Sequence, residues 1–206
     1  VGEASQPPVR AVHQSPPGAA EALAVPLGPR TMLICGDASP EVGAAVTALS
    51  TAARLPLVAE PSSNARAGSL RTGRLLLDGP LAEAIERVVV FGHPTLSRPV
   101  NRLLARSDVE LIVVSPTADW IDPGWRAARV APAVSLAPDD GRWAAQWASA
   151  DGRVSAALDA LLATQPVLTG PAVAAAVVAI AHERRRSRPL SLRITAWMRA
   201  RAEGAT

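Results

Sequence analysis

Four short, continuously apolar segments constrain the fold of this chain more than any other feature of its sequence. They span residues 31–35, 55–59, 88–92 and 109–115, and none alternates between apolar and polar side chains. A strand of this kind is buried on both faces, which is typical of a parallel sheet covered by helices. The intervals between the segments are long enough for crossover helices. The sequence therefore predicts an α/β fold with a doubly wound, mostly parallel sheet.

Capping signals predict where the first helix begins. Ser39 can accept a backbone N–H, Pro40 suits the first helical position, and Glu41 favours the positive end of the helix dipole. Apolar periodicity and turn residues predict the remaining elements. These are helices over residues 79–86, 95–106 (with Pro99 in its first turn) and 141–163, and a possible fifth strand over residues 130–137.

Composition divides the chain into five expected segments. The first 30 residues contain six Pro, which argues against regular structure there. The last 24 contain seven Arg and two Glu, a net charge of +5, whereas the rest of the chain has a net charge of −2. The expected segments are a disordered Pro-rich arm or linker (residues 1–30), an α/β domain (31–140), a long linker helix (141–166), a further helix (167–183) and a disordered basic tail (184–206).

The charge pattern and the apolar runs bear on location and partners. A basic tail can bind nucleic acid, but the body of the chain has no basic stripe and aromatic residues are few, so a nucleic-acid binder is a weak hypothesis. No apolar run is long enough to span a bilayer, and no signal peptide is visible, so we expect a cytoplasmic protein.

The turn "GDASPE" after the first apolar segment allows two specific interpretations. A nucleotide-binding turn would need further glycines or a Lys, and neither is present. Alternatively, Gly36-Asp37-Ala38 followed by Asn64 imitates the spacing of a Mg²⁺ and thiamine-diphosphate motif, but the third Gly is replaced by Ala38. An ordinary strand-to-helix turn is the favoured interpretation, and the sequence predicts no catalytic, metal-binding or cofactor-binding residue.

For two candidate nucleophiles or bases, Cys35 and His93, the surrounding sequence favours a structural role. Cys35 lies inside an apolar run with no His near it in sequence, so we expect a small buried side chain. His93 lies in the turn after the third apolar segment, with no Ser or Cys at a recognisable spacing, so we expect it to make loop hydrogen bonds.

Several stretches resemble one enzyme family. "RVVVFGHPTLSRPVNRLL" (residues 87–104), "ADWIDP" (118–123), "LPLVAEPSSNARAG" (55–68) and "LTGPAVAAAVV" (168–178) are similar to the central domain and adjoining helix of 2-succinyl-5-enolpyruvyl-6-hydroxy-3-cyclohexene-1-carboxylate synthase. This family makes menaquinone precursors with thiamine diphosphate and Mg²⁺. The resemblance implies a Rossmann-like scaffold domain, with residues 167–183 as the first helix of a truncated diphosphate-binding domain.

The resemblance also implies what this chain lacks. In the family, decarboxylated 2-oxoglutarate is added to isochorismate at a cofactor held by separate pyrimidine and diphosphate domains. We therefore expect the chain alone to bind no cofactor and to be inactive, its partners being those missing domains or further copies of the intact enzyme. The alternative is a stand-alone Rossmann-like protein that binds a small ligand.

Arg66 and Arg98 are the predicted ligand-binding residues. Each follows a predicted strand, and loops at the carboxyl ends of parallel strands meet at the edge of the sheet where ligands collect. Two guanidinium groups there could hold an aromatic carboxylate as a regulatory ligand. A purely structural role, in which both side chains pair with acids or contact other domains, is the competing interpretation.

Overall fold

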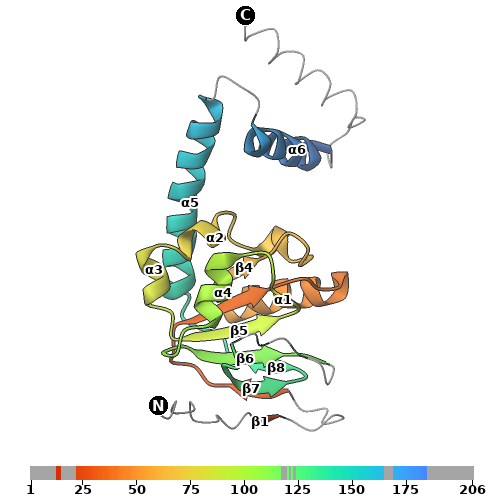
Figure 1. Cartoon of the computed structure of the whole chain (residues 1–206), viewed down its shortest axis with the longest axis vertical. Helices are drawn as coiled ribbons and strands as arrows, with labels where there is room; N and C mark the ends of the chain where they lie inside the picture. Colours follow the sequence, from red (N-terminus) through yellow and green to blue (C-terminus); the bar gives the residue numbers. More distant parts are fainter. Residues whose placement is uncertain are drawn as a thin grey trace, which may run out of the picture. The chain divides into compact units, whose positions relative to one another are not determined.

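The protein is built on one parallel sheet, in which the strand order is β1-β7-β6-β5-β3-β4 (Figure 1). The computed structural model describes residues 13–14, 22–116, 120, 122, 124–164 and 169–184 of the 206-residue chain. A separate pair of parallel strands, β2 and β8, lies beside the main sheet. The strands are β1 (His13–Gln14), β2 (Leu23–Val25), β3 (Thr31–Cys35), β4 (Leu57–Ala59), β5 (Arg87–Phe91), β6 (Glu110–Val114), β7 (Ala127–Ala131) and β8 (Val134–Leu136).

Helices connect these strands, so the predicted doubly wound α/β fold is confirmed. They are α1 (Pro40–Ala53), the short 3₁₀ helix η1 (Arg66–Gly68), α2 (Gly73–Leu76), α3 (Pro80–Glu83), α4 (Arg98–Leu104), α5 (Arg142–Ala163) and α6 (Gly170–Arg184). Ser39 caps α1 as predicted, its Oγ accepting the N–H of Val42 at 3.4 Å. Pro99 lies in the first turn of α4, behind the N-cap Ser97.

The two faces of the main sheet carry two separate apolar clusters. On one face Met32 and Ile34 pack with residues of α3, α4 and α5. On the other, Leu33 and Cys35 pack with residues of α1 and β2. All four side chains are fully buried, which explains why the strands are continuously apolar and do not alternate.

Two expectations were wrong in detail. The fifth strand predicted over residues 130–137 is two strands, because Pro132 has no N–H with which to continue the ladder: β7 ends at Ala131 beside β6, and β8 begins at Val134 beside β2. Residues 1–30 were expected to lack regular structure, yet β2 lies in that segment. Arg87 holds it by donating from Nη1 to the carbonyl of Pro26 at 2.7 Å.

The chain divides into two compact units, Val1–Gly152 and Arg153–Thr206. The predicted long helix is confirmed as α5, which begins in the first unit and continues into the second. The second unit also contains α6, where a helix was predicted over residues 167–183; its assignment to a diphosphate-binding domain stays a prediction. Residues 185–206 of the predicted basic tail lie outside the described residues. Among the described helices, none is long and apolar enough to cross a membrane.

Two Trp and one Asp attach the first half of α5 to the first unit. Trp143 donates from its indole N–H to the carbonyl of Thr31 at 2.9 Å, and its ring meets that of the fully buried Trp147 edge-on at 5.7 Å. Asp151 accepts from the backbone N–H of Thr72 at 2.6 Å and from its hydroxyl at 2.7 Å. The sequence predicts α5 as a linker helix, but the beginning of α5 is part of the core.

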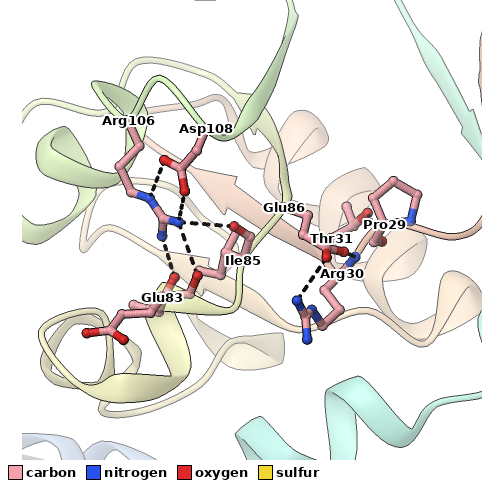
Figure 2. Close-up of polar contacts among 9 residues, drawn as sticks. Pro29, Arg30, Thr31, Glu83, Ile85, Glu86, Arg106 and Asp108 are labelled. Carbon is pink, nitrogen blue, oxygen red and sulfur yellow. Dashed lines mark hydrogen bonds and ion pairs between the residues drawn. The ribbon is translucent and has the colours of Figure 1, made fainter.

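The guanidinium of Arg106 closes the end of α3 (Figure 2). It donates to the backbone carbonyls of Ala82 at 2.5 Å, Glu83 at 3.1 Å and Ile85 at 3.4 Å, which have few partners at a helix end. It also pairs with Asp108 at 2.6 Å. The hydrogen bond between the two side chains lowers the pKa of Asp108 and raises the pKa of Arg106.

Ion pairs link the starts of neighbouring strands at the amino edge of the sheet. Arg30 binds Glu86 through its side chain at 2.8 Å and its backbone N–H at 2.7 Å (Figure 2). Glu110, at the start of β6, pairs with Arg87 at 2.7 Å and with Arg129 of β7. Burial alone would raise the pKa of Glu110, but the hydrogen bonds from Arg129 and Arg87 outweigh that effect, and the pKa is lowered.

Glu110 should therefore stabilise the fold in its charged form. Because its pKa in the folded state lies below the ordinary 4.5, the contribution is complete above pH 4.5 and is lost as the pH falls through the lower folded value. Urea unfolding between about pH 7 and pH 2 should show a steeper loss of stability for the unaltered chain than for Glu110→Gln. Glu86→Gln, which alters a more exposed pair, is the matched control and should cost less at neutral pH. Equal losses in the two variants would contradict the role given to Glu110.

Candidate functional site

The carboxyl edge of the sheet around β3 is where a ligand site is expected. The chain passes from β3 to β4 on one side and then crosses to β5 on the other side of β3. At such a reversal of strand order the loops after the two central strands diverge, and ligands of open α/β sheets bind in the resulting crevice.

In this protein the backbone closes that crevice. The N–H of Asp37 donates to the carbonyl of His93 at 3.0 Å, and the N–H of His93 returns the bond to Asp37 at 2.9 Å. The approach needs glycine on both sides: a Cβ at Gly36 would lie 2.1 Å from the nitrogen of Pro94, and Gly92 has a φ of +64°. The backbones of the two loops are thus joined across the end of the sheet, which agrees with the favoured interpretation of "GDASPE" as a strand-to-helix turn.

Among the residues that imitate a metal motif, Asn64 has a structural partner. The side-chain amide of Asn64 donates to the carbonyl of Ala38 at 2.7 Å, so it ties the loop after β4 to the loop after β3. No group of three or more His, Cys, Asp or Glu side chains that could hold a metal ion occurs in the described part of the chain.

Cys35 is a buried core residue, as predicted. Desolvation by burial, together with the charge of the nearby Glu60, raises the pKa of its thiol to about 11. The thiol stays protonated at neutral pH and is a poor nucleophile.

Glu60, the residue after β4, holds the loop after β5 in place. Its carboxylate accepts the backbone N–H groups of Thr95 at 3.0 Å, Leu96 at 2.9 Å and Ser97 at 3.1 Å. Because β4 and β5 flank β3, the Glu60 side chain reaches across the end of the central strand. Glu60 is only 3% exposed. Three N–H donors compensate for burying its charge.

Arg66 and Arg98 are each close to residues of this anchor. Arg66, in η1, donates from Nη1 to the carbonyl of Ala59 at 3.0 Å, next to Glu60. Arg98 directly follows Ser97, is exposed, and has no partner for its guanidinium among the described residues. The structure thus places both arginines at the carboxyl edge, while giving Arg66 a backbone partner. Binding of a ligand by the two side chains stays a prediction.

A pocket of about 660 Å³ opens beside the closed crevice. Its walls come from α1, from the ends of β5 and β6, and from the connection between β7 and β8. Asp37 and His93 contribute polar side chains, and Trp120 lies on its wall, whereas neither Arg66 nor Arg98 lines it. Trp120 belongs to the stretch "ADWIDP"; its neighbour Asp122 accepts the N–H groups that begin β7.

Neither Glu60 nor the pocket was predicted from the sequence. A charged residue directly after a buried strand is a detectable signal for Glu60, although nothing in the sequence indicates which donors it meets. No short stretch of the sequence indicates the pocket, because its walls come from segments spread between Asp37 and Val134.

We expect loss of the Glu60 carboxylate to be among the more damaging single changes in the chain. Glu60→Ala leaves three N–H groups without their acceptor, and unfolding in urea should show a loss of about 3 kcal/mol or more. Glu60→Gln keeps one acceptor oxygen and should lose less. Glu41→Ala, at an exposed position of α1, is the control and should cost well under half as much. If the urea concentration at the unfolding midpoint is the same for Glu60→Ala as for the unaltered chain, the hydrogen bonds to Glu60 contribute little to stability.

No family model matches the chain, but similar proteins are known. Over 175 residues it is 51% identical to 2-succinyl-5-enolpyruvyl-6-hydroxy-3-cyclohexene-1-carboxylate synthase from Kineococcus radiotolerans, a match that covers 79% of this chain and 31% of that protein. The synthase of the same name from a Nocardioides species is 48% identical over 162 residues, covering 73% of this chain and 30% of the synthase. The one from an Arthrobacter species is 43% identical over 159 residues, covering 72% and 26%.

This chain therefore spans about a third or less of the length of these relatives. The resemblance predicted from "RVVVFGHPTLSRPVNRLL" and the associated stretches is confirmed. The chain is therefore homologous to one segment of the 2-succinyl-5-enolpyruvyl-6-hydroxy-3-cyclohexene-1-carboxylate synthases.

Proposed function

We propose that this chain is the central scaffold and regulatory domain of a synthase that adds decarboxylated 2-oxoglutarate to isochorismate. The observation that carries the proposal is the 51% identity to the Kineococcus radiotolerans synthase over 175 residues. The name of that synthase gives the product of its reaction, and the substrates follow from the family resemblance. A stand-alone ligand-binding protein is less favoured, because the identity extends over 79% of the chain.

The chemistry of the carboxyl edge agrees with a scaffold role. The crevice where an open α/β sheet could take a diphosphate is closed by the bonds between Asp37 and His93. Glu60, the buried acid at this edge among the described residues, is engaged with backbone donors. Thiamine diphosphate and Mg²⁺ would therefore be held by other domains of the enzyme, and this chain alone would be inactive.

A chimera tests the scaffold proposal. The aligned segment of the Kineococcus radiotolerans synthase is replaced by the matching segment of this chain, and product formation from isochorismate and 2-oxoglutarate is followed. We expect kcat/KM within about tenfold of the parent, because the segment contributes packing and leaves the reacting groups unchanged. The isolated chain, assayed with thiamine diphosphate and Mg²⁺, should show no turnover.

Two results would contradict the proposal. One is a chimera that melts cooperatively at the temperature of the parent yet has no activity. The other is turnover by the isolated chain.

We further propose that Arg66 and Arg98 bind an aromatic carboxylate that regulates the enzyme. Both lie at the carboxyl edge, and Arg98 is exposed with no partner among the described residues. Arg66 donates to the carbonyls of Ala59 at 3.0 Å and Arg71 at 3.5 Å and to the hydroxyl of Ser69 at 3.4 Å, so its position is held. Its Nε–H has no partner among the described residues and can meet a ligand. Planar guanidinium groups suit a carboxylate because each can donate two parallel hydrogen bonds.

Thermal shift and calorimetry with hydroxynaphthoate, an aromatic carboxylate, test the two arginines. Arg66→Ala or Arg98→Ala should weaken binding about tenfold, since each removes a charge-assisted hydrogen bond of roughly 1.5–3 kcal/mol. Arg98→Lys should restore part of the affinity. Arg74→Ala, at an exposed arginine of α2, removes the same charge elsewhere and is the control. The idea fails if Arg74→Ala weakens binding as much as the other two.

A further inference from the structure

The pocket beside α1 is a second candidate site that the scaffold role does not explain. It lies on the α1 face of the sheet, where one helix and the β2–β8 pair provide the cover. Its volume of about 660 Å³ lies within the range of small-molecule sites. Val46 and Phe91, both buried, form part of its wall, so the interior is fixed by the core.

The charge of the lining decides which ligands fit. Asp37 is the one carboxylate among the described residues that line the pocket, and no arginine is among them. Asp37 is exposed, and its side chain has no hydrogen-bond partner in the described part of the chain. An anionic ligand would meet repulsion there, whereas an N–H or O–H group would find an acceptor.

The remaining wall favours flat, apolar ligands. Trp120 contributes a partly buried aromatic ring, and Leu49 and Val114 add partly buried aliphatic side chains. A ring system can fill such a space with little loss of conformational entropy and can meet the ring of Trp120 by stacking or edge-on contact.

We propose that this pocket binds a neutral aromatic compound of about two or three rings, with an N–H or O–H group that donates to Asp37. The site is independent of the arginine pair, because neither Arg66 nor Arg98 lines the pocket. The pocket is also separate from the closed crevice. The backbone bonds between Asp37 and His93 close the crevice, and both residues line the pocket.

Two fluorescent naphthylamines that differ in charge test the proposal on the full chain. N-phenylnaphthylamine is neutral and carries one N–H, and anilinonaphthalenesulfonate has the same rings with an added sulfonate. We expect the neutral probe to bind saturably, one molecule per chain, and at least about tenfold more tightly than the sulfonate. Asp37→Asn should weaken the neutral probe about fivefold and strengthen the sulfonate, because the carboxylate charge is removed while the side-chain shape is kept.

Matched variants on α1 distinguish the pocket from other apolar surface. Ala45 is exposed at the pocket mouth, whereas its neighbour Ala44 is exposed and does not line the pocket. Ala45→Trp should obstruct the mouth and weaken the neutral probe about tenfold or more, whereas Ala44→Trp should leave its affinity unchanged. Both variants keep the core, and equal melting temperatures would show that each is folded.

Equal affinity of the neutral probe in the two Trp variants would overturn the proposal, as would tighter binding of the sulfonate to the unaltered chain. Arg66→Ala and Arg98→Ala are included so that the two proposed sites can be told apart. They should leave the neutral probe unaffected, and a loss of its binding there would assign the probe to the arginine site and reject the pocket.

Discussion

The carboxyl edge of this protein depends on one buried carboxylate. Glu60 accepts three consecutive backbone N–H groups, from Thr95 to Ser97, and has almost no contact with water. A buried charge is tolerated only where donors replace the lost hydration, so the loop after β5 must keep the conformation that presents those donors. The same loop leads into α4, whose buried face contributes Val100, Leu103 and Leu104 to the core. The contact therefore links the end of β4, the position of α4 and the setting of Arg98.

The two edges of the sheet are stabilised by different interactions. At the amino edge, charged side chains cross between strands, as Glu110 does in pairing with Arg87 and Arg129. At the carboxyl edge the backbone provides the connections, through the mutual hydrogen bonds of Asp37 and His93 and through the donors to Glu60. Apart from Glu60 and Arg66, two charged side chains at the carboxyl edge, those of Asp37 and Arg98, have no partner among the described residues, so they are available to a ligand.

Homology and geometry together restrict the role of this segment. The relatives are at least about three times as long as the region that matches this chain. The catalytic groups of such a synthase therefore need not lie in the matched segment. The backbone bonds between the loops after β3 and β5, with their close approach at Gly36 and Gly92, agree with the proposed scaffold role. Two features of this edge differ in chemistry. One is the pair Arg66 and Arg98, close to residues of the Glu60 anchor, and the other is an apolar pocket whose carboxylate among the described residues is Asp37.

The sequence by itself determined the fold class and most elements, because burial on both faces requires continuous apolar strands and because Ser39 and Pro99 mark helix starts locally. It also indicated the resemblance to the synthases, since the contiguous stretch "RVVVFGHPTLSRPVNRLL" can be compared residue by residue without knowledge of the fold. The tertiary structure alone decided that residues 130–137 divide between β7 and β8, because the partner of β8 is β2, more than 100 positions earlier. It alone decided that Glu60 meets the N–H groups of residues 95–97 and that α1 and the β7–β8 connection enclose a pocket. Such contacts join segments distant in the chain, and no local preference specifies them until the sheet has set their positions.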